Sequence, residues 1–261
     1  MPRRSRGIQR AWDDYFIPGT SVLRNKFTGP GRPYGESDPQ RLRLLEEQFT
    51  SLRLAELHMA PVPGQFDYAH MKAIHWHIFQ DVYDWAGEER TAPTSGHMTK
   101  DGHAYYPAGP ALTQAAEAEY AKIAAANYLR GLEHGRFVAE LAERWGELNV
   151  VHSFREGNTR AQFVFFSQLA EQAGYRLETD AFGIGNRLRD DFVEARFHSQ
   201  ATGSNDRLRV VLEQVVTTVP VQREAPSAID EIRQRVAEAL RQAGEPTVAR
   251  GNQHRSEGYE R

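Results

Sequence analysis

Apolar residues recur every three or four positions along much of the chain, and this spacing predicts helices. A first helix is expected to begin at Asp38-Pro39, because Asp is a good N-cap and Pro suits the first helical position. Its apolar stripe consists of Leu42, Leu45, Phe49, Leu52 and Leu57. A second helix is expected to begin after Asp67 and to end at Gly87. Later helices are expected over 111–130, 136–151, 159–173, 183–199 and 205–218.

The stretch from 90 to 109 lacks this helical spacing. Asp101-Gly102 lies between two short arms rich in Thr and Tyr, one of which contains Thr99-Lys100. An Asp-Gly pair in this context is a strong signal for a β-hairpin. The whole pattern therefore predicts an all-α fold, a helical bundle that carries one exposed β-hairpin.

Turn-forming residues and shifts in composition divide the chain into three parts. Residues 1–38 are rich in Pro and Gly and are expected to be an irregular N-terminal segment. Residues 39–219 are expected to form the main helical domain. Residues 220–261 are expected to contain an accessory amphipathic helix over 227–243, with an apolar stripe, followed by a disordered tail.

Composition excludes several classes of protein. Of the 261 residues, 40% are hydrophobic and 26% are charged, and the formal net charge is −3 with a pI of about 6.4. This balance gives no general attraction to nucleic acid or to an anionic membrane. The chain has no cysteine, which excludes disulfides, thiolate metal sites and a cysteine nucleophile. With no apolar run long enough for a signal peptide or a membrane span, a cytoplasmic protein is expected.

The nine residues from His152 to Arg160 concentrate the side chains that can do chemistry. The loop at Gly157 leads into a predicted helix, and the backbone N–H groups of a helix N-terminus bind phosphate. Arg160 adds a guanidinium that can donate two hydrogen bonds to a phosphate, and Glu156 supplies an oxygen suited to Mg²⁺. His152 is the nearby group able to act as a base near neutral pH. A lone His-x-x-x-Glu pair is more typical of a structural hydrogen bond, so the interpretation depends on the complete string.

The complete string resembles the signature of the Fic family, His-x-Phe-x-(Asp/Glu)-Gly-Asn-(Gly/Thr)-Arg-x-x-Arg. The resemblance extends over roughly residues 12–216. Residues 18–25 are similar to the entry segment of Fic toxins, residues 66–91 to their second helix and its exit, and the hairpin to their flap. The resemblance implies an α-helical Fic fold with a hairpin flap. It also implies a toxin-like protein adenylyltransferase, which transfers AMP from ATP to a Tyr, Ser or Thr hydroxyl of a target protein.

Matched to the signature position by position, the residues receive roles. His152 would be the catalytic base, and Glu156 would hold a Mg²⁺ cofactor between the phosphates of ATP. Nucleotide binding is assigned to Thr99, Lys100, Glu156, Gly157, Asn158, Thr159 and Arg160. The hairpin around Thr99-Lys100 would align an extended segment of the target protein as an added strand.

Two positions depart from the signature. Ser153 stands where the family usually has Pro, and Phe163 stands where the final Arg of the signature would contact the γ-phosphate. Phe can neither donate a hydrogen bond nor carry charge, although we expect it to line the nucleotide cleft. Two alternatives therefore remain open beside AMP transfer from ATP. One is a degenerate Fic module that binds nucleotide or a partner without transfer, and the other is a Fic transferase that uses another donor.

Regulation is implied by the same resemblance. Fic enzymes are commonly inhibited by a helix with the pattern (Ser/Thr)-x-x-x-Glu-(Gly/Asn), and the chain contains no full match to it. The nearest sequence is Ser227–Glu231, which is followed by Ile232. The resemblance thus implies the class inhibited by a separate small antitoxin chain, which would be a second protein partner beside the target.

Overall fold

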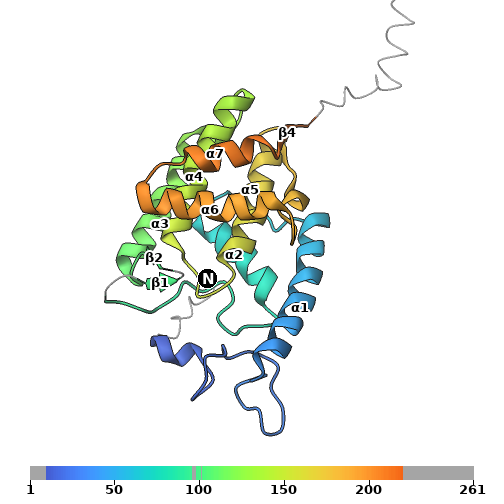
Figure 1. Ribbon diagram of the computed structural model, residues 1–261, viewed down its shortest axis with the longest axis vertical. Coiled ribbons are helices and arrows are strands. Elements are labelled where there is room, and N and C mark those ends of the chain that lie inside the picture. Colours follow the sequence, from blue (N-terminus) through green and yellow to red (C-terminus); the bar gives the residue numbers. More distant parts are fainter. Residues whose placement is uncertain (1–9, 96–97, 101, 220–261) are drawn as a thin grey trace, which may run out of the picture. The chain divides into compact units, whose positions relative to one another are not determined.

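Seven α-helices account for most of the residues that the structure describes (Figure 1). The structure is a computed structural model that describes residues 10–95, 98–100 and 102–219. The helices are α1 (Pro39–Met59), α2 (Tyr68–Phe79), α3 (Pro110–Ala125), α4 (His134–Val151), α5 (Asn158–Gln172), α6 (Arg187–Thr202) and α7 (Asp206–Glu213). Short 3-10 turns are η1 (Trp12–Tyr15), η2 (Asn127–Leu129) and η3 (Thr179–Phe182). The expected all-α fold with one hairpin flap is confirmed.

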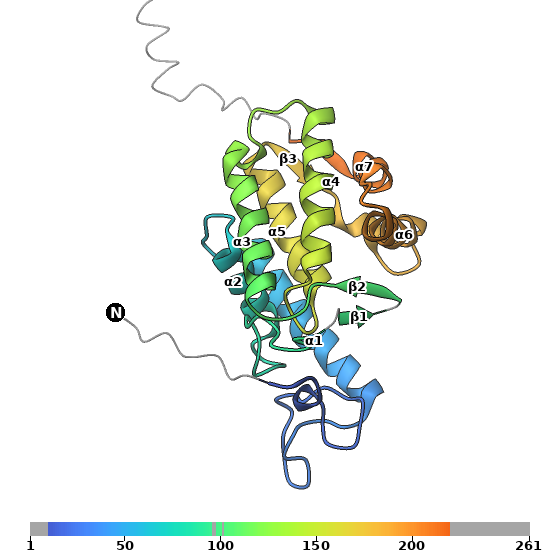
Figure 2. The same cartoon turned by 90° about the vertical axis from the view of Figure 1, so that its left-hand side faces the viewer.

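The helices pack around α4 and α5. Figure 2 shows α3, α4 and α5 side by side, with α6 and α7 running across α4. α2 packs on α5, and α1 packs in turn on α2. The large side chains at the centre are fully buried and include Trp145, Phe137, Phe165 and Phe166. The aromatic core therefore fixes the positions of α4 and α5, whose facing ends carry the His152–Arg160 loop between them.

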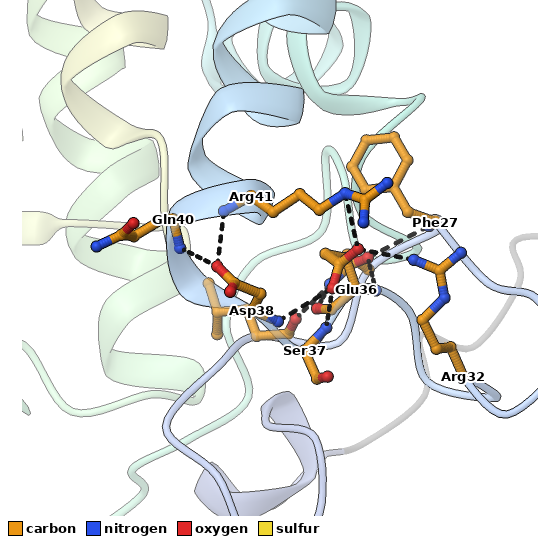
Figure 3. A network of polar contacts seen from close by, with 9 residues as sticks. Phe27, Arg32, Glu36, Ser37, Asp38, Gln40 and Arg41 are labelled. Atoms are coloured by element: carbon orange, nitrogen blue, oxygen red, sulfur yellow. Dashed lines mark hydrogen bonds and ion pairs between the residues drawn. The ribbon is translucent and has the colours of Figure 1, made fainter.

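The start of α1 is set by a network of acidic side chains (Figure 3). The Asp38 carboxylate accepts hydrogen bonds from the backbone N–H groups of Gln40 and Arg41, both at 2.9 Å. These bonds satisfy two of the N–H groups that a helix N-terminus leaves without partners, so the expected N-cap is confirmed. The buried carboxylate of Glu36 forms an ion pair with Arg32, with Nη1 and Oε2 2.7 Å apart, and connects the irregular segment to this cap.

Several expected boundaries and faces were wrong. α2 ends at Phe79 and not at Gly87, because the chain turns at 80–87 and packs Val82 and Trp85 into the core. α3 ends at Ala125, and the expected helix at 205–218 ends at Glu213. On α1, Phe49 and Leu52 are exposed, and the inward face instead carries Glu46 and Thr50 between Leu42 and Leu57.

Two small antiparallel strand pairs complete the described part of the fold. The expected hairpin is formed by β1 (Met98–Lys100) and β2 (His103–Tyr105), with Thr99 opposite Ala104 and Lys100 opposite His103. The second pair, β3 (Tyr175–Leu177) with β4 (Val216–Thr218), was not expected, since the apolar run at 215–216 suited a helix equally well. This pair closes the end of the core that lies farthest along α5 from the loop.

The accessory helix expected at 227–243 and the tail after it lie outside the described residues. Within the described part of the chain, no helix combines the length and the apolar character needed to cross a membrane.

Candidate active site

His152 terminates α4 in a left-handed backbone conformation, with φ 50° and ψ 60°. Its carbonyl oxygen accepts a hydrogen bond from Arg90 Nε at 2.8 Å, and its ring lies 4.1 Å from the ring of Tyr105 on β2. The side chain is only 5% exposed, so this histidine packs under the hairpin as well as facing the loop. The bond from Arg90 holds the backbone of His152, and the Tyr105 ring packs against its imidazole.

A buried arginine connects His152 to the hairpin. Arg90 is 1% exposed, and beside its bond to His152 it donates from Nη2 to the carbonyl oxygen of Tyr106, immediately after β2. Its backbone N–H donates to the Ser153 carbonyl at 2.9 Å. Burial lowers the pKa of Arg90 to about 10. One side chain thus holds both the end of α4 and the exit of the hairpin.

The loop after His152 closes on itself. Asn158 accepts the Phe154 N–H at 2.9 Å and donates to the Phe154 carbonyl at 2.7 Å. Gly157 has φ 80°, and a Cβ there would lie 2.2 Å from the Phe79 ring, so this position requires glycine. The side chain of Asn158 is therefore occupied within the loop, and the backbone N–H groups of 158–160, in the first turn of α5, are the donors that can face an anion.

His75 on α2 supports the loop from the opposite side. Its Nδ1 accepts the Gly87 N–H at 2.8 Å, so its Nε2 carries the proton and donates to the Glu156 carbonyl at 2.9 Å. The His75 ring stacks on the Phe154 ring, with ring centres 3.8 Å apart. Complete burial lowers the pKa of His75 to about 3, which keeps the ring neutral. The backbone of Glu156 is fixed in this way, while its side chain stays half-buried near the end of the loop, one residue before the N-cap Gly157.

Arg160 extends from α5 toward α1. Its guanidinium pairs with the Glu46 carboxylate, donates to Thr50 Oγ1 at 3.2 Å, and lies 4.6 Å from the centre of the Phe79 ring. Glu46 also accepts the hydroxyl of Tyr83. Since a guanidinium has five N–H donors in one plane, these contacts orient Arg160 and leave donor capacity for a phosphate.

Phe163, one turn after Arg160, has two environments. One side of its ring packs against Trp145, Phe182 and Phe192, with ring centres 5.1–5.2 Å apart. Its other side, together with Arg160, lines a cavity of about 480 Å³ between α1, α5 and η3. Phe163 thus lies beside Arg160 at the wall of a cavity, as well as in the aromatic packing, and its place in a nucleotide cleft stays a prediction.

The hairpin lies beside the end of α4 (Figure 2). Thr99 and Lys100 are on β1, and in the described residues this strand pairs only with β2. On the other side, β2 is held by α6, where Gln200 donates to the Ala104 carbonyl and Phe197 stacks on His103 at 4.0 Å. The structure thus brings the hairpin and the His152–Arg160 loop together.

The carboxylate of Glu156 fits one kind of metal site. The described residues contain no cluster of three or more His, Asp or Glu side chains that could hold an ion by themselves. Glu156 Oε1 accepts the Gly157 N–H at 3.1 Å. A single carboxylate beside an anion-binding helix start suits Mg²⁺, which is commonly bound by one or two carboxylates together with substrate phosphates.

Several residues around the site were missed by sequence reasoning. The missed residues are Glu46, Thr50, His75, Arg90, Tyr105 and Arg196. Glu46 and Thr50 had a signal that could have found them, since polar residues at i and i+4 lie on the buried face of α1. The others contact the loop across long stretches of sequence, and spacing alone carries no sign of those contacts.

With this geometry described, comparison with known proteins defines the class. Residues 65–170 match the Fic/DOC family. Over 207 residues the chain is 33% identical to "Probable protein adenylyltransferase Fic" of Salmonella typhimurium, covering 78% of this chain and 92% of the relative. The chain therefore belongs to the Fic/DOC family.

A second relative and two solved structures extend the comparison. "Protein adenylyltransferase VbhT" of Bartonella schoenbuchensis is 32% identical over 216 residues, which cover 81% of this chain and 40% of VbhT. BepC of Bartonella tribocorum, solved with AMPPNP, has a TM-score of 0.68 at 24% identity over 79% of this chain and 97% of BepC. A Fic domain of Bartonella quintana, solved with ADP, has a TM-score of 0.69 at 24% identity over 78% of this chain and 95% of that domain. These two structures share the fold of this chain.

Proposed function

We propose that this protein transfers AMP from ATP to a hydroxyl group of a target protein. The observation that supports the proposal is the short loop that begins with His152 at the end of α4, passes through Glu156 and leads into the first turn of α5 with Arg160, in a chain whose relatives are named protein adenylyltransferases. In this proposal a base, a carboxylate and a guanidinium would face one anion site. Phosphoryl-type transfer requires little more from the protein than positioning and charge stabilisation.

In the proposed reaction, the target hydroxyl oxygen attacks the α-phosphorus of ATP and forms the new P–O bond. The bond to the oxygen that bridges the α- and β-phosphates breaks, and pyrophosphate leaves on the opposite side. The hydroxyl proton passes to the imidazole of His152. The backbone N–H groups of 158–160 and the guanidinium of Arg160 bind the phosphate oxygens.

Glu156 is the residue that would hold Mg²⁺ together with the phosphates of ATP. When bound, Mg²⁺ would neutralise charge on the reacting phosphates. The carbonyl of Glu156 is held by the neutral ring of His75, so the carboxylate extends from a fixed backbone.

The hairpin would present the target. An outer strand such as β1 offers backbone groups to which an extended segment can add. Strand addition fixes the register of the segment, so that one hydroxyl side chain is brought to His152, under Tyr105 of the neighbouring strand. The strand pairing would thus select the modified residue.

The experiment combines the purified protein with ATP, Mg²⁺ and bacterial lysate, and mass spectrometry detects proteins that gain one AMP. His152→Asn is the control, because Asn tolerates the left-handed conformation of residue 152 better than Ala does. We expect AMP transfer by the wild type and none by the variant. Transfer at the wild-type rate by His152→Asn would remove His152 as the base. ATP binding without transfer by the wild type would favour the binding module instead.

A further inference from the structure

α6 places a buried arginine against the first turn of α5. Arg196 is 9% exposed, and its Nη1 donates to Thr159 Oγ1 at 3.2 Å. Its Nε, at 3.0 Å, and its Nη2 both donate to Asn149 Oδ1 on α4. Thr159 is the second residue of α5, so the guanidinium is anchored next to the backbone N–H groups that face the proposed phosphate site.

No carboxylate balances this charge. Within the described residues, Arg196 forms no ion pair, and both of its hydrogen-bond partners are neutral. Burial lowers the pKa of Arg196, which reflects the cost of its charge in this place. The half-buried Arg144 and Arg160, by contrast, pair with Glu119 and Glu46. A buried charge without a counter-charge is costly, and a bound anion would relieve that cost.

The side chains around the proposed phosphate site leave little positive charge for a bound polyphosphate. Phe163 brings no charge to the helix face it shares with Arg160, and Arg155 is packed against Trp12 and Phe16 of the N-terminal segment. Arg160 itself is already paired with Glu46. Arg90 also forms no ion pair among the described residues, but it is bound to the carbonyls of His152 and Tyr106, before α5 begins. Arg196 is instead a buried guanidinium without a carboxylate partner that bonds a residue of the first turn of α5.

We propose that Arg196 supplies the second positive charge of the phosphate site, acting through Thr159, and that a bound polyphosphate is its counter-charge. The proposal rests on the proposed function insofar as the polyphosphate is that of a nucleoside triphosphate. Arg196 is a positioning residue: its N–H groups hold Thr159 and Asn149, and its charge acts on the phosphates across the first turn of α5.

Calorimetry on the full-length protein tests this with Mg²⁺-ATP, inorganic pyrophosphate and adenosine. Arg196→Gln removes the charge while keeping a donor for Asn149. We expect it to weaken binding of ATP and pyrophosphate by about 10- to 150-fold, the range of a charge-assisted contact, and to leave adenosine binding unchanged. The dependence of ATP affinity on salt concentration should also become shallower. Arg196→Lys, which keeps the charge, should recover most of the affinity.

Arg144→Gln is the matched control, because it removes a half-buried arginine whose charge Glu119 already balances. It should leave ATP affinity unchanged. If Arg196→Gln does not fold, Thr159→Val, which removes the hydroxyl that receives the guanidinium, should weaken ATP binding in the same direction. An Arg196→Gln protein that folds and binds ATP with wild-type affinity and salt dependence would overturn the proposal. A wild type that binds ATP but transfers no AMP would instead contradict the proposed function alone.

Discussion

At the scale of single residues, the loop is controlled by side chains whose protonation is set by burial. His75 is the strongest case, since its neutral ring accepts from Gly87 and donates to Glu156. In the unfolded chain its pKa returns to about 6.5, whereas in the fold it is about 3. The unfolded chain therefore binds one more proton than the folded chain between these two values, and stability falls as the pH falls through this window.

The free energy of unfolding should accordingly decrease by about 2 kcal/mol between pH 7.5 and pH 5 on account of His75. The measurement is urea unfolding at both pH values, with His75→Gln as the comparison. Gln can accept and donate as His75 does but does not titrate, so the variant should lose this share of the pH dependence. An equal pH dependence in the two proteins would show that His75 does not stay neutral in the fold.

Glu156 gives a second prediction at this scale. Because its proposed role is to hold Mg²⁺, Glu156→Ala should weaken ATP binding in the presence of Mg²⁺ much more than in EDTA. Calorimetry in the two buffers measures the difference. Equal losses in both buffers would assign the Glu156 side chain to the loop structure, through its bond to the Gly157 N–H.

At the scale of elements, α5 carries both the site and part of the core on one short stretch. Arg160 and Phe163 line the same cavity, while Phe165, Phe166 and Leu169 are buried on the other side of the helix. The string 152–160 could be found from the sequence because its members are neighbours in the chain. Glu46 had only an indirect signal, the polar residues on the buried face of α1. Arg196 had none, since α6 reaches this helix turn only after folding.

Phe163→Arg tests what this face of α5 lacks. The variant loses aromatic packing on Trp145, Phe182 and Phe192, although the Arg stem can lie along the apolar cavity wall. We expect a loss of about 2–3 kcal/mol in stability, seen as a Tm about 5–10 °C lower. We also expect AMP transfer to rise by about 10- to 150-fold if the added guanidinium contacts phosphate in the transition state.

Phe163→Leu is the control for packing, because it removes the aromatic ring without adding charge. It should lower the Tm to a similar extent and leave transfer unchanged. If Phe163→Arg folds and transfers AMP no faster than Phe163→Leu, the missing guanidinium is not what limits this protein, and a different donor or a binding role gains support.

At the scale of the whole molecule, the N-terminal segment packs against the loop that carries the candidate site. Trp12 and Phe16 lie 4.2 and 5.0 Å from the guanidinium of Arg155, the residue before Glu156. Arg10 pairs with Glu88 at 2.7 Å, which ties the same segment to the turn after α2. The density of Pro and Gly predicted an irregular segment but carried no sign of what that segment would cover.

Trp12→Ala should therefore reduce the rate of transfer by several fold, since a cation–π contact is worth about 0.5–2 kcal/mol and this one restrains the loop between His152 and Glu156. The effect should fall on kcat more than on KM, because Arg155 does not face the proposed phosphate site. Trp76→Ala is the matched control, as Trp76 on α2 is 52% exposed. Steady-state kinetics would contradict the prediction if both variants behaved alike.

The sequence predicted the helices of the molecule better than its small strands. Asp38 and Asp67 both cap helices as expected, because an N-cap is a local interaction of three or four residues. β3 and β4 were missed because strands of three residues carry too short an alternation to detect. Only their mutual pairing defines them, and the paired residues Tyr175 and Thr218 are 43 positions apart in the chain. Long-range pairing is a property of the folded chain.

Arg90 is bound to the carbonyl of His152 and to the carbonyl of Tyr106, and this has a consequence for any exchange of the hairpin. Two hydrogen bonds hold the base of the hairpin. The Ala108 N–H donates to the Pro93 carbonyl at 2.7 Å, and Arg90 donates to the Tyr106 carbonyl. A hairpin taken from a relative would have to keep both bonds. A graft with junctions inside these bonds exchanges the outer strand and leaves His152 anchored. A graft with junctions outside these bonds replaces the hairpin and also the contact that supports the His152–Arg160 loop. Chimeras of the two designs would therefore separate the effect of the outer strand from the effect of the loop.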